Sequence, residues 1–204
     1  MSPRAHHLDP SIPTPRDQMT VEEFLGFTEA RPAGEWWELI EGIAVLQHSP
    51  SKAHQIIAGN VVLLLQLERR RLAASWLPLL GVGTVVPISP RSLPRPDVFV
   101  LQHPDQGEAA YENTTRDGIV LFEVLPRSNG PKDQAWRRRV YASIPNCQHY
   151  VTIHQRRIEV VRHDRASGWD GTKLKTIDTT LTLPALGSEL PLAEIYADTP
   201  LAKA

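Results

Sequence analysis

The chain has 204 residues, of which 41% are hydrophobic and 22% are charged, and its formal net charge is −1. This composition suits a globular domain with a full hydrophobic core, and it lacks the overall basic charge that would indicate a nucleic-acid-binding surface. The only cysteine, Cys147, excludes an intramolecular disulfide and a cysteine-based zinc site. The N-terminus has no signal-peptide core and no apolar run could span a bilayer, so we expect a cytoplasmic protein without a membrane partner.

The N-terminal segment, residues 1–17, contains four prolines and few residues that could pack in a core. We expect a flexible tail there, followed by one domain over residues 18–204. Thr20 can cap a helix in which two early glutamates suit the positive end of the helix dipole. The alternating residues 36–47, with Glu41-Gly42 in the middle, predict two strands joined by a tight turn.

The middle of the chain begins with the longest helical pattern, which Ser51 can cap and which ends in three arginines. Residues 81–89 ("GVGTVVPIS") and 95–102 ("RPDVFVLQ") each indicate a strand. Residues 117–125 ("DGIVLFEVL") are apolar at nearly every position. Such a run is typical of a strand that is covered on both faces.

The last third of the chain predicts a helix over residues 131–144, with Pro131 near its first turn. Three strands are expected after it, followed by a short helical piece at residues 192–197. The strands are expected at residues 148–154, 156–164 and 174–183. This alternation of helices and strands predicts an α/β fold with a central mixed sheet flanked by helices, preceded by an N-terminal helix and hairpin.

Two of the apolar strand runs each carry one acid, Asp97 in the first and Glu123 in the second. A carboxylate buried in such a run costs several kcal/mol unless it is paired or bound to a cation. If the two strands are neighbours, the acids can converge, and two hard oxygen ligands suit Mg²⁺ or Mn²⁺. Two structural alternatives stay open: Pro96-Asp97 as turn chemistry at a strand entrance, and Glu123 pointing to solvent at a strand end.

A wider pattern accompanies these acids. The segments "EWWELIEGIAVL", "KAHQIIAGN", "RPDVFVLQ", "FEVLPRS", "DQAWRRRVYASIPNCQHYVTIH" and "RRIEVVRHD" follow one another in this order. Together they resemble the Uma-two family, whose members are described as "putative restriction endonucleases" within the PD-(D/E)XK nuclease superfamily. The resemblance covers residues 20 to 197 and implies a restriction-endonuclease-like fold.

The resemblance also implies roles for particular residues. Glu38, Asp97 and Glu123 would be the catalytic carboxylates that hold the metal ion. Arg137, on the next helix, would be the catalytic residue at the position of the family's lysine and would offset negative charge in the transition state. His54, Asp133 and Tyr141 would contact phosphate or support the metal-binding carboxylates. Asp133, Arg137 and Tyr141 are spaced four residues apart and therefore share one helical face.

This sequence departs from the family pattern at two places. Pro126 replaces a serine of the family's "EVLSPS" segment, and Arg137 replaces its lysine. In the superfamily a lysine usually follows the glutamate by two positions, where this chain has Leu125. Arginine keeps the positive charge but cannot take part in proton transfer. An alternative reading makes Asp133 and Arg137 an ordinary ion pair on a helix surface.

The resemblance implies a Mg²⁺- or Mn²⁺-dependent DNA endonuclease, a hydrolase in which a metal-activated water attacks the phosphodiester bond. DNA is the expected partner, bound mainly through its phosphates. A two-fold homodimer would supply the two sites that cutting a duplex requires, although no interface is evident in the sequence. The alternative hypothesis is a catalytically impaired nuclease-fold protein that binds nucleic acid or a protein partner, motivated by the arginine at position 137.

Overall fold

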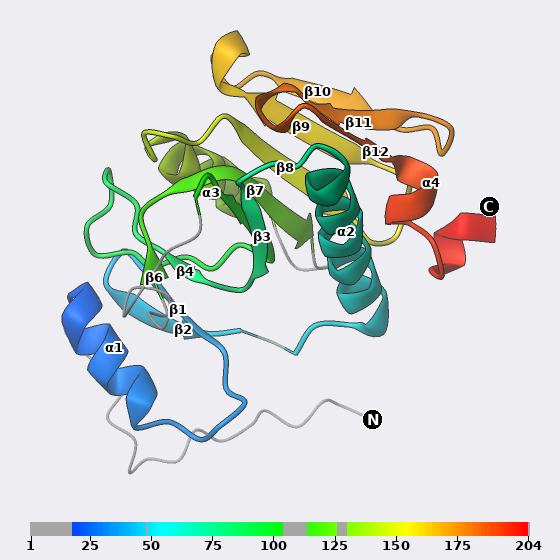
Figure 1. Ribbon diagram of the computed structural model, residues 1–204. Coiled ribbons are helices and arrows are strands. Elements are labelled where there is room, and N and C mark those ends of the chain that lie inside the picture. Colours follow the sequence, from blue (N-terminus) through cyan, green and yellow to red (C-terminus); the bar gives the residue numbers. More distant parts are fainter. Residues whose placement is uncertain (1–17, 48, 104–113, 126–129, 204) are drawn as a thin grey trace, which may run out of the picture.

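The computed structural model describes residues 18–47, 49–103, 114–125 and 130–203. The tail expected over residues 1–17 lies outside these ranges. The expected α/β fold is confirmed, because helices and strands alternate along the chain (Figure 1). The helices are α1 (Val21–Glu29), α2 (Lys52–Arg71), α3 (Pro131–Ala142) and α4 (Leu192–Ile195).

A mixed six-stranded sheet forms the centre of the molecule, with the strand order β10-β9-β8-β7-β5-β3. Strands β7 and β8 pair in parallel, whereas the other neighbours in this sheet are antiparallel. The strands are β1 (Trp37–Ile40), β2 (Ile43–Leu46), β3 (Leu77–Leu80), β4 (Gly83–Thr84), β5 (Val98–Leu101), β6 (Thr114–Thr115), β7 (Gly118–Leu125), β8 (His149–His154), β9 (Val160–Asp164), β10 (Gly171–Leu174), β11 (Thr180–Leu183) and β12 (Ser188–Pro191).

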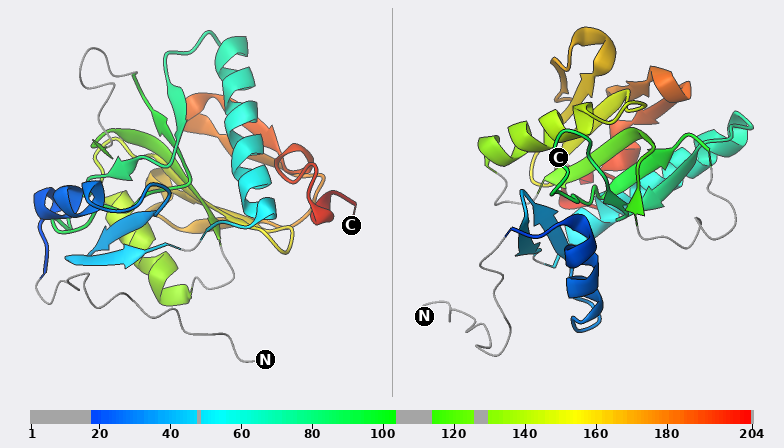
Figure 2. Two further views of the ribbon diagram at one scale, coloured as in Figure 1. Left: turned by 90° about the horizontal axis from the view of Figure 1, so that it is seen from below. Right: turned by 90° about the vertical axis from the view of Figure 1, so that its left-hand side faces the viewer.

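Helices α2 and α3 cover opposite faces of this sheet, because successive side chains of a strand point to opposite sides. Val61 and Leu65 of α2 pack in one cluster with Phe122 of β7. Val140 of α3 packs in another cluster with Leu121 of the same strand. Figure 2 shows the sheet between the two helices. Every residue of β7 is buried, which confirms the prediction of a strand covered on both faces.

Helix α1 and the β1–β2 hairpin form a smaller layer beside the main sheet, at the blue end of the chain in Figure 1. Thr20 caps α1 through a reciprocal pair of hydrogen bonds with Glu23, as expected from the sequence. The hairpin turns at Glu41-Gly42, where both φ angles are positive. Leu93 N donates to Leu39 O at 2.8 Å, which joins the hairpin to the segment that leads into β5.

Two strand predictions need correction. The strand expected over residues 81–89 shrinks to β4, and the chain instead forms β3 at Leu77–Leu80. Pro78 is tolerated in β3 because this strand lies at the edge of the sheet. The strand expected over residues 174–183 is divided, since Thr179 N donates to Thr176 O in a turn between β10 and β11.

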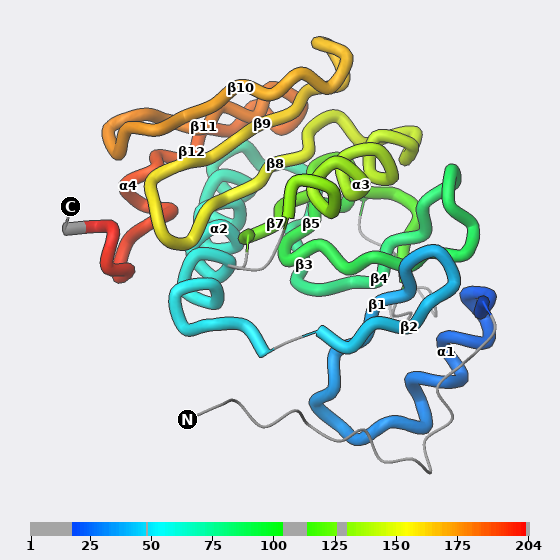
Figure 3. The backbone as a smooth tube through the Cα atoms, turned by 180° about the vertical axis from the view of Figure 1, so that it is seen from behind, coloured from blue at the N-terminus to red at the C-terminus, as the bar shows by residue number. Residues whose placement is uncertain are grey.

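The C-terminal elements pack on α2. Figure 3 shows α4 and the β11–β12 hairpin next to this helix. The Asn60 side chain donates to the carbonyl oxygens of Ile195 and Ala197 at 3.2 and 2.9 Å, which fixes the end of α4 against α2. Among the described residues, no helix combines the length and apolar character needed to cross a membrane.

Candidate active site

Asp97 and Glu123 lie next to each other where the pairing of β5 and β7 ends. The antiparallel register pairs Val98 with Phe122, so the next residues outward on the two strands are these two acids. Asp97 Oδ2 accepts a hydrogen bond from Val124 N at 2.7 Å. Beyond the end of β5, the Asp97 side chain thus accepts the hydrogen bond from β7 that a backbone carbonyl of a paired strand would otherwise accept. Strands β5 and β7 are therefore neighbours, which meets the condition under which the sequence analysis expected the two acids to converge.

Arg137 of α3 lies in the middle of the buried acids. Its Nη1 and Nη2 donate to the two carboxylate oxygens of Glu38 at 3.1 and 2.6 Å, and Nη1 also donates to Glu123 Oε1 at 2.9 Å. The Nε atom contacts Asp133 Oδ2 at 3.4 Å. We call Glu38, Asp97, Glu123 and Arg137 the carboxylate cluster. Arg137 is only 5% exposed, so its interpretation as part of a surface ion pair is wrong.

Tyr141 completes the helical face that the spacing of α3 predicted. Its hydroxyl donates to Glu123 Oε1 at 2.8 Å and lies 3.4 Å from Arg137 Nη1. Burial, reinforced by the Glu123 carboxylate, raises the pKa of Tyr141 well above its ordinary value. Tyr141 therefore stays neutral and acts as a hydrogen-bond donor that fixes one oxygen of Glu123.

Glu123 is buried and does not point to solvent at the strand end. Burial raises the pKa of Glu123 to about 8. The positive charge of Arg137 lowers this pKa, while the neighbouring carboxylates of Asp97 and Glu38 raise it further. Burial alone would lower the pKa of Arg137, but the Glu123 carboxylate holds it well above its ordinary value. The single guanidinium of Arg137 thus contacts the carboxyl groups of Glu38, Glu123 and Asp133. Because acids outnumber basic groups in this cluster, a further cation would be attracted to it.

His54 lies beside Asp97 at the start of α2. Ser51 Oγ accepts from His54 N at 3.2 Å, which confirms the predicted cap and fixes the first turn. The Nε2 atom of His54 lies 3.2 Å from Asp97 Oδ2. Its Nδ1 atom is buried and has no hydrogen-bond partner in the described part of the chain. The structure thus places His54 in contact with a carboxylate of the cluster.

Sequence reasoning missed Arg95, whose backbone N donates to Glu38 Oε1 at 2.7 Å. Arg137 also donates a hydrogen bond to each oxygen of Glu38, so the two arginines together fix the orientation of this carboxylate. The only sequence signal for Arg95 was its place directly before Pro96-Asp97. A backbone N–H contact of this kind depends on the path of the loop, and almost any residue type could make it, so the sequence does not indicate it.

The free carboxylate oxygens fit a divalent ion. Asp97 Oδ1 and Glu123 Oε2 have no hydrogen-bond partner among the described residues, and hard oxygen ligands suit Mg²⁺ or Mn²⁺. Both oxygens of Glu38 are engaged by arginines. Within the described ranges, no three His, Cys, Asp or Glu side chains are grouped so that they could hold a metal ion together. In this arrangement at most two of the carboxylates, those of Asp97 and Glu123, would be available to hold an ion.

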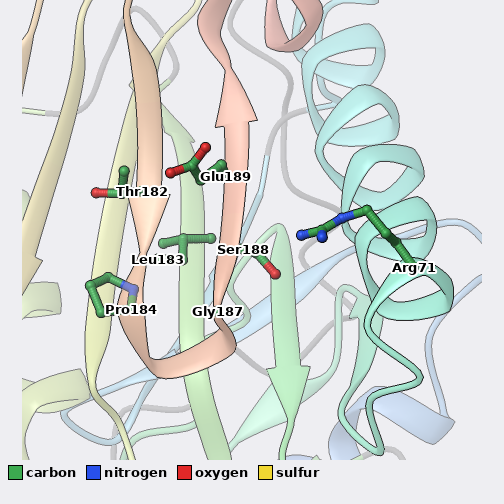
Figure 4. A pocket seen from close by; sticks show the side chains of 7 residues that line it. All are labelled: Arg71, Thr182, Leu183, Pro184, Gly187, Ser188 and Glu189. Atoms are coloured by element: carbon green, nitrogen blue, oxygen red, sulfur yellow. The ribbon is translucent and has the colours of Figure 1, made fainter.

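A separate hollow of about 440 Å³ lies between the end of α2 and the turn from β11 to β12 (Figure 4). Arg71, Thr182, Ser188 and Glu189 supply its polar groups. Arg71 is already paired with Glu68 at 2.7 Å. The hollow shares no residue with the carboxylate cluster, so it is not the place where the cluster would act.

Comparison with protein families identifies the chain's relatives. The model of the Uma2 family, described as "Putative restriction endonuclease", matches residues 21–193. The chain belongs to the Uma2 family. The match covers Asp97, the strand β7 that carries Glu123, and all of α3. The predicted family is thereby confirmed, and with it a relationship to proteins described as nucleases.

The fold has a solved counterpart. The structure of a "putative nuclease belonging to DUF820" from Anabaena variabilis ATCC 29413 superposes with a TM-score of 0.72 at 14% sequence identity, covering 88% of this chain and 98% of that one. At this identity the likeness establishes a shared fold, and it confirms the expected nuclease-like architecture of this Uma2 protein. Among curated proteins, none matches the chain.

Proposed function

We propose that this Uma2 protein is a Mg²⁺- or Mn²⁺-dependent DNA endonuclease of the PD-(D/E)XK type. The observation that carries the proposal is the meeting of Asp97 and Glu123 at the end of β5 and β7, beside the buried Arg137. Within the described residues, each of these two acids keeps one oxygen without a hydrogen-bond partner, and the carboxylate cluster contains three acids but only one guanidinium. A metal-binding site would give the buried Glu123 a role beyond its ion pair with Arg137.

Asp97 and Glu123 would hold the ion through their free oxygens. When bound, the ion supplies a Lewis acid that activates water and neutralises charge on the phosphate. Rigid strands hold both acids, because Val124 N fixes Asp97 and the Tyr141 hydroxyl fixes Glu123. Glu38 stays a predicted third ligand, and it would have to release a hydrogen bond from Arg137 or from Arg95 to serve as one.

Arg137 has two roles in this proposal. It orients Glu38 and Glu123, and it places a permanent positive charge where negative charge grows on the phosphate. Because its pKa is too high for proton transfer, Arg137 acts through charge and hydrogen bonds alone. His54 holds Asp97 in position, and Asp133 contacts the Nε atom of Arg137. DNA would bind mainly through its phosphates, and a homodimer would allow both strands to be cut.

A second function is favoured by one observation. The Nε, Nη1 and Nη2 atoms of Arg137 all donate to acids of the protein itself, which leaves few donors for a phosphate. A nuclease-fold protein that binds nucleic acid or a protein without cutting would be compatible with this arrangement. The two functions differ in whether the purified protein cleaves DNA.

Cleavage of plasmid and single-stranded DNA in Mg²⁺, Mn²⁺ or EDTA tests the proposal. We expect cutting with either ion and none in EDTA. The Asp97→Asn variant should reduce cutting by roughly a hundredfold or more, because it retains an acceptor for Val124 N but removes the ligand charge. The matched control is Asp170→Asn, which changes an exposed acid in the turn before β10 and should leave cutting unchanged.

Two outcomes would contradict the proposal. If clean wild-type protein shows no metal-dependent cutting, the binding function is favoured instead. If Asp97→Asn cuts as well as the wild type does, the carboxylate cluster is not the catalytic site.

A further inference from the structure

Trp36 is a large apolar side chain that remains 52% exposed immediately before β1. The hairpin ladder extends to this residue, because Gln47 N donates to Trp36 O at 2.7 Å. Since side chains alternate along a strand, Trp36 and Glu38 point to the same face of the hairpin. An exposed indole ring therefore lies on the face that carries one acid of the carboxylate cluster.

The Trp36 ring is held in place by two neighbours. The guanidinium carbon of Arg95 lies 5.1 Å from the centroid of the ring. Arg95 is itself fixed, because Nε and Nη2 donate to Gly81 O at 3.0 and 2.7 Å. Gly81 has a φ of +56°, and a Cβ atom added there would lie 3.0 Å from the ring of Trp36. We call Trp36, Gly81 and Arg95 the tryptophan platform.

The tryptophan platform is joined directly to the carboxylate cluster. The backbone N of Arg95 donates to Glu38 Oε1, while the Arg95 side chain faces Trp36. Arg95 also stands two residues before Asp97. One residue thus connects the exposed ring to both acids, and Arg95 Nη1 keeps no hydrogen-bond partner in the described part of the chain.

We propose that the tryptophan platform stacks an unpaired nucleobase next to the bond to be cut, so that the enzyme prefers single-stranded or frayed DNA. The inference rests on the proposed nuclease function and names its substrate class. Aromatic rings stack on any base, and a neighbouring arginine adds charge attraction to the nucleotide. Bases inside a duplex are stacked on one another and offer no free face, so the ring selects unpaired nucleotides.

Binding of a fluorescent oligothymidylate to the full chain in EDTA tests the platform without any cleavage. We expect Trp36→Ala to weaken binding by roughly tenfold, because the variant loses the aromatic face on which a base would stack. Trp36→Phe should retain much of the affinity because it keeps an aromatic face. The matched control is Leu63→Ala on α2, which truncates a side chain that is 57% exposed and should leave binding unchanged.

The same variants are compared on a duplex of mixed sequence. We expect wild-type protein to favour the single strand and Trp36→Ala to lose that preference. If Trp36→Ala and the wild type bind the single strand with equal affinity, the stacking role of the tryptophan platform is wrong. It is also wrong if the wild type prefers the duplex or binds neither DNA. Metal-dependent cutting alongside such a result would leave the nuclease proposal standing. Trp36-dependent binding without any cutting would instead contradict the nuclease and retain the stacking site.

Discussion

Glu38 and Glu123 share the guanidinium of Arg137 as an ion-pair partner. A planar guanidinium can meet both oxygens of Glu38 with parallel donors, and it does so here. A lysine ammonium is a compact charge and could not make the same paired contact. The arginine therefore holds Glu38 more firmly than the family's lysine would. Firm binding of Glu38 stabilises the fold, but it also restrains an acid that is a predicted metal ligand.

Replacing Arg137 separates these two effects. We expect Arg137→Lys to lower the free energy of unfolding by about 1–3 kcal/mol, because a charge-assisted hydrogen bond to Glu38 is lost. Arg137→Met should cost more, about 3–5 kcal/mol, because it leaves the buried Glu38 and Glu123 without the cation that they share. Urea denaturation measures both values. Metal-dependent cutting by the lysine variant should equal or exceed that of the wild type, and a large loss would show that arginine itself is required.

Glu123 predicts a dependence of stability on pH. Its pKa rises from 4.5 in the unfolded reference to about 8 in the fold, so the folded state favours the protonated acid. The stabilisation is complete below pH 4.5 and is lost as the pH rises through about 8. In that window the free energy of unfolding should fall by at most about 1.4 kcal/mol per pH unit.

Urea denaturation in EDTA at several pH values, with Glu123→Gln as the comparison, isolates this effect. The glutamine variant cannot ionise, so the difference between it and the wild type should grow in favour of the variant toward alkaline pH. A constant difference between the two proteins would show that Glu123 titrates alike in the folded and unfolded states.

At the scale of elements, the sequence predicted best those segments whose pattern and end signals agree. Helix α2 starts after its Ser51 cap, helix α3 starts at Pro131, and β7 is the fully apolar run. Strand β3 escaped prediction because the sequence "LPLL" does not alternate and contains a proline, which only an edge position allows. That edge position depends on the pairing of β3 with β5, which no local pattern reveals.

The site was less predictable than the strands that carry it. Asp97 and Glu123 could be inferred from two apolar runs that each hold one acid, because neighbouring strands bring such residues together. Glu38 and Arg137 are 99 positions apart, and the sequence pointed to them only through the family resemblance. The platform contact of Arg95 with Trp36 depends on the loop at Gly81, so neither residue type indicated it beforehand.

At the scale of the whole molecule, the carboxylate cluster ties together parts of the fold that pack in different hydrophobic cores. Glu38 belongs to β1 in the small layer of α1 and the hairpin, whose core contains Leu39 and Leu93. Glu123 belongs to the central sheet, and Arg137 belongs to α3 on one of its faces. A ligand that binds the cluster would therefore stabilise the contact between these parts and not only one local segment.

Binding of a divalent ion should accordingly raise the midpoint of thermal unfolding. At a tenfold excess of Mn²⁺ or Mg²⁺ over its dissociation constant, the stabilisation is about 1.4 kcal/mol, which corresponds to about 3–6 °C for a chain of this size. Scanning fluorimetry with and without the ion measures this shift. Asp97→Asn should abolish the shift, while the exposed control Asp170→Asn should retain it, because only the first variant removes a proposed ligand. An equal shift in both variants would place the ion elsewhere on the protein, even if the wild type cuts DNA.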